Sequence, residues 1–294
     1  MIAFPPHIIF QQGTSTPTSS PTTSGPTAIP INIFQFETKH SGGGCLEPSE
    51  LQNGKGLRIK SCTSDDVQKW IVSSTGQIAN MKDPNYCLTR KKAKPKLQIA
   101  SCISVEKDLS TFAYDWFDST IVLLSTRELI SIPLDASSKK VLFVVKDNKG
   151  AADEQKWTLL APDGSSVPAI PSKFSIRNPS ENKCLRPKTG TVKSLIVVEA
   201  CGDKKIEKWT SDQYGQIHSQ KDFSLCIAKS KKSLILNECK SSGSKKTSFL
   251  YNYWDNLIYR KGNPKVVTVT SRGTVKLRKR KEDTTKHVWY FELA

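Results

Sequence analysis

The eight cysteines are the residues with the clearest capacity for chemistry. They form four successive pairs separated by 17, 15, 17 and 13 residues: Cys45–Cys62, Cys87–Cys102, Cys184–Cys201 and Cys226–Cys239. Disulfide bonding and zinc binding both use paired cysteines. Zinc is disfavoured because the sequence has no Cys-x-x-Cys pair and only four scattered histidines. We therefore expect no metal site and one disulfide within each pair, each stabilising the fold by about 3 kcal/mol.

Catalytic motifs are absent from the sequence. It contains no Gly-x-Ser-x-Gly, no His-Glu-x-x-His and no phosphate-binding glycine-rich loop. The acidic pairs Asp65-Asp66 and Asp153-Glu154 are interpreted as solvated turns. We therefore expect a protein that is not an enzyme and needs no cofactor.

Positive charge is concentrated in the C-terminal part of the chain. The formal net charge is +17, and residues 172–294 hold 26 Lys+Arg against 11 Asp+Glu. This asymmetry predicts an anionic partner, such as a sulfated glycan, nucleic acid or an acidic surface. A lysine-rich surface that only aids solubility explains the counts equally well. Nucleic acid is the least favoured of these partners. Aromatic residues that could stack on bases do not alternate with the lysines, and disulfides argue against a nuclear protein.

The N-terminal tail differs from the rest in composition. Residues 14–27 consist of Ser, Thr, Pro and one Gly, which predicts disorder. This composition is typical of O-glycosylated extracellular stalks, and equally of an unmodified tether. Met1–Phe10 has neither a positive n-region nor an unbroken apolar stretch, so it is not predicted to be a signal peptide. Four disulfides nevertheless predict a secreted or cell-surface protein, and no apolar run is long enough for a membrane span.

An internal duplication positions the cysteines. Seven residues of the first half recur 139 positions later: Cys45, Cys62, Trp70, Gly76, Gln77, Ile78 and Cys87 match Cys184, Cys201, Trp209, Gly215, Gln216, Ile217 and Cys226. Phe112–Asp118 also matches Phe249–Asp255 at an offset of 137. The duplication predicts two homologous domains, residues 31–168 and 172–294, after a disordered tail of residues 1–30.

Each domain is itself threefold. Short β-type runs recur three times in each half: 57–60, 97–100 and 141–145, then 195–198, 234–236 and 275–278. Turn signals such as Asn53-Gly54 and Asp163-Gly164 separate them, and no segment shows a helical period. The fold class is therefore all-β, a barrel or sandwich in which three units share one core.

This pattern resembles the ricin B-type lectin domains, which are β-trefoils. The resemblance covers residues 31–294, and its Gln-x-Trp motif is intact at Gln68-Lys69-Trp70 and Gln155-Lys156-Trp157. Degenerate copies end in Trp209 and Trp289, and Phe112 and Phe249 stand at the tryptophan position of the middle units. The resemblance implies two tandem β-trefoils. The basic character and the cysteine-free third units are also similar to the cysteine-rich domain of mannose-receptor-type proteins.

The Gln-x-Trp residues have a structural meaning that is independent of sugar binding. We expect the tryptophans to fill the core and the glutamine amides to satisfy buried polar groups. The residues with this expected role are Gln68, Trp70, Gln155, Trp157, Trp209 and Trp289.

Sugar binding, as the resemblance implies, needs an Asp after Cys-Leu and an aromatic residue before the second cysteine. The Asp position holds Glu47, Thr89, Arg186 or Ala228, and the aromatic position holds no aromatic residue. The galactose-type pocket is therefore expected to be degenerate. We predict instead a glycan partner, acidic or sulfated in the second domain. The candidate carbohydrate-binding residues are Glu47, Lys183, Arg186, Lys188 and Lys193.

Two further basic clusters belong to the second domain. Lys229, Lys231 and Lys232 lie in the loop that corresponds to the Arg186 loop, and Arg278–Lys281 follows the last β run. The alternative function is that of a scaffold without sugar binding, held by a protein partner in an extracellular assembly. Loss of the sugar-contact residues favours the scaffold, whereas the basic second domain favours the lectin.

Overall fold

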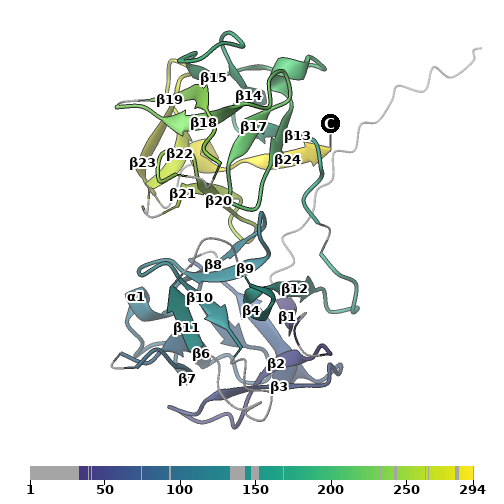
Figure 1. Ribbon diagram of the computed structural model, residues 1–294. Helices are drawn as coiled ribbons and strands as arrows, with labels where there is room; N and C mark the ends of the chain where they lie inside the picture. The colour runs from purple at the N-terminus through teal and green to yellow at the C-terminus, as the bar shows by residue number, and fades with distance from the viewer. Residues whose placement is uncertain are drawn as a thin grey trace, which may run out of the picture. The chain divides into compact units, whose positions relative to one another are not determined.

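The computed structural model contains almost only β-strands (Figure 1). It describes residues 33–38, 40, 42–73, 75–92, 94–132, 143–146, 152–167, 169–231, 233–241, 244–261, 263, 265–281 and 285–293. The predicted disordered tail lies outside these residues, as do Lys232 and Val141. Within the described residues, no helix is long and apolar enough to cross a membrane.

The first repeat contains twelve strands within the described residues. They are β1 (Ile33–Thr38), β2 (Cys45–Pro48), β3 (Leu57–Lys60), β4 (Lys69–Val72), β5 (Ile78–Asn80), β6 (Tyr86–Arg90), β7 (Leu97–Ser101), β8 (Phe112–Asp115), β9 (Thr120–Leu123), β10 (Glu128–Ser131), β11 (Phe143–Lys146) and β12 (Trp157–Leu160). The helix α1 (Lys107–Ser110) and the 3-10 helices η1 (Asp66–Gln68) and η2 (Asp153–Gln155) complete it.

The second repeat has the same number of strands within its described residues. They are β13 (Phe174–Asn178), β14 (Lys183–Pro187), β15 (Ile196–Ala200), β16 (Trp209–Ser211), β17 (Ile217–Ser219), β18 (Leu225–Lys229), β19 (Leu234–Glu238), β20 (Phe249–Asn252), β21 (Leu257–Arg260), β22 (Lys265–Val269), β23 (Val275–Lys279) and β24 (Tyr290–Leu293). Two 3-10 helices, η3 (Lys205–Glu207) and η4 (Thr285–His287), precede β16 and β24.

Six strands of each repeat form a closed barrel, and the other six form three hairpins. In the first repeat β1 pairs with both β4 and β12, β4 with β5, and β8 with β9. The bond from Phe112 N to Gly76 O links β5 to β8, and the bridge between Thr120 and Lys156 links β9 to β12. The second repeat closes in the same way, so the two tandem β-trefoils expected from the resemblance are confirmed.

The repeated glycine of the Gly-Gln-Ile motif is required by this closure. Gly76 and Gly215 have φ values of +86° and +71°, which favour glycine. A Cβ at Gly76 would lie 2.3 Å from the carbonyl oxygen of Phe112, the residue whose N–H donates to Gly76 O. A Cβ at Gly215 would likewise lie 2.1 Å from the carbonyl oxygen of Phe249. The motif therefore serves the close approach of two strands.

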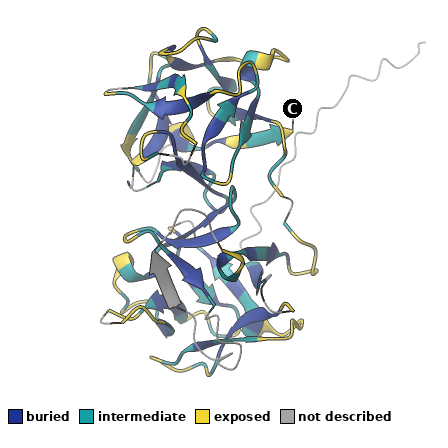
Figure 2. Cartoon of the chain, in the orientation of Figure 1, coloured by how far each residue is buried: buried dark blue, intermediate teal, exposed yellow. Residues whose placement is uncertain are grey.

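Buried residues run through the strands of both repeats (Figure 2). The four tryptophans of the repeat belong to the two cores and have no exposed surface. Each indole N–H donates to a backbone carbonyl, from Trp70 to Leu46, Trp157 to Ile130, Trp209 to Leu185 and Trp289 to Val267, over 3.0–3.2 Å. The middle units hold Phe112 and Phe249 at the same depth. The tryptophans therefore contribute apolar burial and also satisfy strand carbonyls that no water reaches.

We expect Trp209→Phe to lower the free energy of unfolding by about 1–3 kcal/mol, because it leaves the Leu185 carbonyl without its donor and opens a small void. Denaturant unfolding of the full chain measures this difference. Phe249→Leu, which removes no polar contact, is a suitable comparison. An unchanged unfolding midpoint for Trp209→Phe would contradict the role given to the indole N–H.

Four disulfides cross-link the hairpins. The bonded pairs are Cys45–Cys62, Cys87–Cys102, Cys184–Cys201 and Cys226–Cys239, with Cα separations of 4.9–5.1 Å. Each joins the first strand of a hairpin to the segment after its second strand. No cysteine is left free.

The two repeats also meet through one strand pair. β8 and β20 pair at Asp115 and Asn252, and this contact joins β8–β11 and β20–β23 into one eight-stranded sheet. The backbone N–H of Tyr114 donates to Asn252 Oδ1 over 3.0 Å. The duplication alone does not predict this junction, because it gives only the similarity of the repeats.

Candidate functional site

Glu47 lies in β2, at the position that the family resemblance assigns to a sugar-binding Asp. Its side chain is buried, and Oε1 lies 2.7 Å from Arg58 Nε and 3.4 Å from Lys60 Nζ. Gln68, from the first Gln-x-Trp motif, donates to Oε2 over 2.9 Å. Burial raises the pKa of Glu47, but the hydrogen bonds from Gln68 and Arg58 outweigh it and hold the pKa below its ordinary value. Both carboxylate oxygens are therefore engaged by the protein itself.

The second trefoil carries the same cluster with the charges inverted. Arg186 stands in the position of Glu47, and its guanidinium lies 2.9 Å from Glu207 Oε1 and 3.3 Å from Glu199 Oε2. Glu207 is almost fully buried at the glutamine position of Gln-x-Trp, and Glu199 stands where the first trefoil has Lys60. The guanidinium thus neutralises a buried carboxylate in addition to any contact it makes with a ligand.

The other predicted carbohydrate-binding residues do not form one cluster. Lys183 is the first residue of β14, whereas Lys188 follows its last residue. Five positions along a strand correspond to roughly 16 Å. Lys188 and Lys193 are exposed at the far end of the β14–β15 hairpin. The structure therefore separates Lys183 from this hairpin tip and leaves the carbohydrate role of all five residues as a prediction.

A basic pocket lies in the next unit of the second trefoil. Its cavity of about 530 Å³ is bounded by β18, β19, Lys240, residues 244–247 and the end of β21. Five cationic side chains line it, against one carboxylate, that of Glu238: Lys229, Lys231, Lys240, Lys246 and Arg260. Within the described residues none of these five cations forms an ion pair with a carboxylate.

A small residue leaves this pocket open. Ala228 occupies the position held by Glu47 and Arg186 in the units described above, and it has no side chain long enough to fill the space. The corresponding unit of the first trefoil carries Arg90, whose guanidinium lies 2.8 Å from Glu128. In the second trefoil Lys229 stands in the place of Arg90, and Lys265 stands in the place of Glu128, so both positions hold cations. The positive charge of this pocket is therefore not neutralised as it is in the first trefoil.

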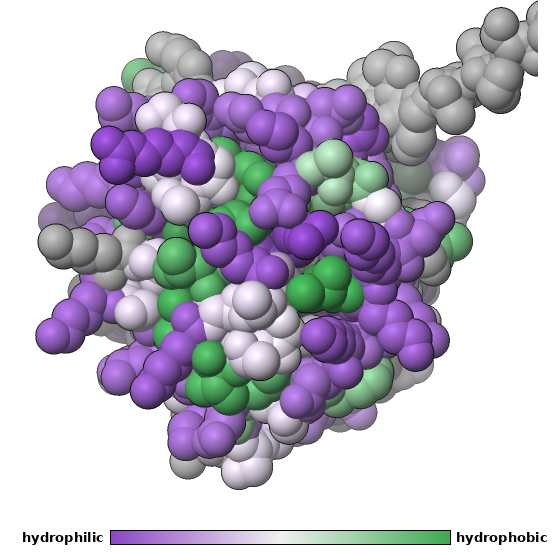
Figure 3. Space-filling view, turned by 90° about the horizontal axis from the view of Figure 1, so that it is seen from above, coloured by the Kyte–Doolittle hydropathy of each residue, from purple (hydrophilic) through white to green (hydrophobic). Residues whose placement is uncertain are grey.

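The lining of the pocket suits a sugar that carries anionic groups. Asn237, Ser230, Ser244 and Thr247 supply hydrogen-bonding groups for hydroxyls, and Ile235 and Ala228 supply a small apolar area. Lysine and arginine bind sulfate, phosphate or carboxylate by charge-assisted hydrogen bonds. The face seen in Figure 3 is mostly hydrophilic, with smaller apolar areas between the polar residues.

Only part of this pocket was predictable from the sequence. Lys229 and Lys231 belong to a predicted basic cluster, whereas Lys240, Lys246 and Arg260 were missed. These three residues match no repeated motif, and only the fold brings their segments beside β18. The one available signal was the excess of lysine between Cys226 and Lys246.

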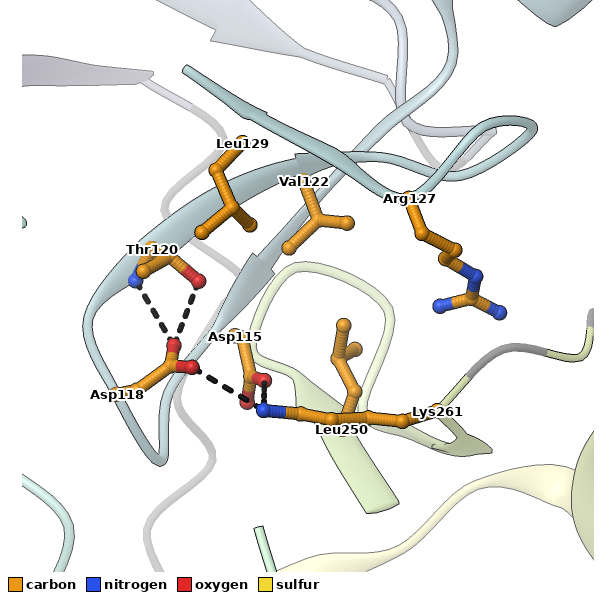
Figure 4. A pocket seen from close by; sticks show the side chains of 8 residues that line it. All are labelled: Asp115, Asp118, Thr120, Val122, Arg127, Leu129, Leu250 and Lys261. Atoms are coloured by element: carbon orange, nitrogen blue, oxygen red, sulfur yellow. Dashed lines mark hydrogen bonds and ion pairs between the residues drawn. The ribbon is translucent and has the colours of Figure 1, made fainter. Parts of the chain in front are cut away.

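A second, smaller cavity of about 50 Å³ lies where β8 meets β20 (Figure 4). Lys261 Nζ lies 3.3 Å from Asp115 Oδ2 and 3.2 Å from Asp118 Oδ2, and Arg127 points away from both carboxylates. Burial, together with the nearby charge of Asp118, raises the pKa of Asp115 to about 7, although Lys261 opposes this shift. The cavity is too small for a sugar, and its charges concern the junction between the repeats.

A family model described as the ricin-type beta-trefoil lectin domain matches residues 33–158 and 172–289. A comparison with the curated proteins gives no match.

Solved structures with similar folds include plant and earthworm lectins. A non-toxic homologue of type II RIPs from Momordica charantia (bitter gourd), in complex with α-methyl-D-galactoside, is 15% identical, with 88% of this chain and 96% of that chain covered and a TM-score of 0.41. The agglutinin from Abrus precatorius is 17% identical, with coverages of 89% and 96% and a TM-score of 0.39. The earthworm lectin C-terminal domain mutant with 6'-sialyllactose is 16% identical, with coverages of 42% and 98% and a TM-score of 0.37.

The family match covers most of the chain, in two tandem regions that agree with the two barrels of the structure. Buried tryptophans at the Gln-x-Trp positions and hairpin disulfides are present in both regions, and the motif itself is intact in the first. The chain therefore belongs to the ricin-type β-trefoil lectin domain family.

Proposed function

We propose that this protein is an extracellular lectin whose second trefoil binds an acidic, sulfated glycan in the pocket lined by Lys229, Lys246 and Arg260. The observation that carries the proposal is the cavity of about 530 Å³ with five cations and a single carboxylate. Family membership supports carbohydrate as the ligand, and the excess of cations supports an anionic carbohydrate. The four disulfides support an oxidising environment outside the cell.

The geometry favours this pocket over the Arg186 cluster as the main binding site. Arg186 is already paired with Glu199 and Glu207. A ligand at Arg186 would have to compete with these carboxylates, whereas a sulfate at Lys229 and Lys246 competes only with water. Lys188 and Lys193 remain candidates for secondary contacts with a longer glycan chain.

The double substitution Lys229→Ala with Lys246→Ala should weaken binding of a sulfated oligosaccharide about tenfold or more, because two charge-assisted contacts are lost. Titration calorimetry of the full chain with heparin-derived and desulfated oligosaccharides measures this effect. The matched control is Lys91→Ala with Lys107→Ala, which removes two exposed lysines from the first trefoil. Unchanged affinity in the Lys229/Lys246 variant would contradict the proposed site.

Salt dependence gives an independent test. Binding to the sulfated probe should weaken as NaCl rises from low to high concentration, because exposed charges are screened. Binding of a neutral galactoside should change little. If neither probe binds the intact, fully disulfide-bonded chain, the scaffold function replaces the lectin function.

A further inference from the structure

The Cys226–Cys239 bridge differs from the other three disulfides in its surroundings. His218 in β17 pairs with Cys226 of β18 across the sheet, and its Nδ1 lies 3.3 Å from Cys239 Sγ. Asp212 Oδ2 lies 3.1 Å from His218 Nε2, and the Phe223 carbonyl lies 3.0 Å from Nδ1. A carboxylate, an imidazole and a sulfur are thus aligned in one contact chain.

Both ring nitrogens of His218 face acceptors, so the doubly protonated ring is favoured. The hydrogen bond to Asp212 raises the pKa of His218, burial opposes this, and the Phe223 carbonyl adds to the rise. An imidazolium beside a sulfur stabilises a thiolate there. A ring nitrogen of His218 and the sulfurs of Cys226 and Cys239 all lie within 4.8 Å of one another, so the same charge attracts a thiolate that approaches Cys239 and stabilises the Cys226 thiolate that leaves.

The two sulfurs differ in accessibility. Cys226 has no exposed surface, whereas Cys239 is half-buried. Because the attacking thiolate needs an approach to the sulfur that it bonds, Cys239 is the sulfur that it can reach.

We propose that the Cys226–Cys239 bridge is a site of thiol–disulfide exchange, at which a small thiol of the glutathione class attacks Cys239 beside His218 and Asp212. The thiolate RS⁻ forms a bond to Cys239 Sγ, and Cys226 Sγ leaves with the electron pair of the broken S–S bond and takes a proton. A second RS⁻ then attacks the sulfur of the bound thiol, which releases RSSR and the Cys239 thiolate. Two thiols are oxidised and one protein disulfide is reduced.

The first trefoil contains a natural control. Its corresponding bridge, Cys87–Cys102, also pairs a buried sulfur with a half-buried one, and Cys102 Sγ likewise contacts a backbone carbonyl, that of Pro84. Ala79 pairs with Cys87 in the place of His218, and Ser73 stands in the place of Asp212. The two bridges thus differ mainly in the imidazole and the carboxylate.

Thiol–disulfide exchange at this bridge would affect the basic pocket. Ala228 and Lys229 follow Cys226 in β18, and Glu238 and Lys240 flank Cys239. Reduction would release the connection between these two sides of the pocket and is expected to weaken glycan binding. This consequence rests on the proposed function, whereas the exchange chemistry itself does not.

The experiment uses the full chain in reduced glutathione near pH 7, with timed alkylation and mass spectrometry of each cysteine peptide. We expect Cys226–Cys239 to be reduced about tenfold faster than Cys87–Cys102, and the glutathione adduct to form on Cys239. His218→Ala should bring this rate close to that of Cys87–Cys102. Equal rates for the two bridges in the unmodified chain, or an adduct on Cys226, would overturn the proposal.

A gain-of-function variant keeps the test decisive if His218→Ala disturbs folding. Loss of folding would accelerate reduction at all four bridges, which the same spectra show. Ser73→Asp with Ala79→His builds the imidazole and carboxylate beside Cys87–Cys102. We expect several-fold faster reduction at that bridge alone, and no acceleration would show that the two side chains do not promote exchange.

Discussion

Arg186→Ala is expected to lower the free energy of unfolding by about 3–5 kcal/mol, because it leaves the buried carboxylate of Glu207 without its cation. The guanidinium lies 2.9 Å from Glu207 Oε1, and the Glu207 residue is only 2% exposed. Gly202 packs over the same carboxylate, since a Cβ there would lie 3.1 Å from Oε2, so little water can replace the lost partner. Urea unfolding of the full chain at neutral pH measures the loss.

A double-mutant cycle separates the ion pair from simple loss of side-chain packing. Arg186→Ala with Glu207→Gln should cost less than Arg186→Ala alone, because no buried charge remains. The quadruple substitution Arg186→Glu, Val197→Arg, Glu199→Lys and Glu207→Gln rebuilds the Glu47, Arg58, Lys60 and Gln68 set of the first trefoil and should recover most of the stability. A cost below about 1 kcal/mol for Arg186→Ala would instead favour a free guanidinium and thus the ligand-binding role predicted from the sequence.

The buried framework was accessible to sequence reasoning because its residues repeat at fixed offsets. Trp70 and Trp209 share one offset with Gly76 and Gly215, and both pairs serve barrel closure or core filling. Such positions need the same kind of residue in corresponding units of the two repeats, so the repeat indicates them without knowledge of contacts. The all-β class and the two domains followed from the same regularity, whereas the trefoil fold followed from the resemblance to ricin B-type lectin domains.

The ion-pair partners of Arg186 could not be predicted from the repeats. Its partners are 13 and 21 residues away, and they meet it only when β14, β15 and η3 pack together. A signal did exist, since Glu47 and Lys60 become Arg186 and Glu199 with reversed charges, and the neutral Gln68 becomes the carboxylate Glu207. The sequence contains an even weaker signal for the basic pocket, because Lys240 and Lys246 lie in a segment whose position depends on the whole fold.

The junction between the repeats predicts an unusual dependence of stability on pH. The pKa of Asp115 is raised from 3.8 to about 7, first by burial and then by Asp118. The native state therefore keeps a proton that the unfolded chain releases, so the stabilising contribution is complete below about pH 4 and is lost as pH rises to about 7. This carboxyl should lower the free energy of unfolding by up to about 1.4 kcal/mol per pH unit in that window.

Asp115→Asn isolates this contribution from those of other groups. Asn252 stands at the matching position of the second repeat, and its Oδ1 accepts from the Tyr114 and Trp254 backbone N–H groups, so an amide is compatible with this turn. The stability of the native sequence relative to this variant should fall from pH 4 to pH 7 and then level off. A difference that stays constant with pH would place the pKa of Asp115 near its ordinary value.

Lys261 sets the upper limit of the same pH window. Its ammonium lies 3.3 Å from Asp115 and 3.2 Å from Asp118 and opposes the rise in the pKa of Asp115. Lys261→Met keeps the aliphatic packing but removes this charge, so the pKa of Asp115 should rise further and the loss of stability should continue above pH 7. Because Lys261 and Asp115 belong to different repeats, the same variant tests whether the contact between β8 and β20 persists in solution. If the two trefoils separate, Lys261→Met should leave the pH dependence unchanged.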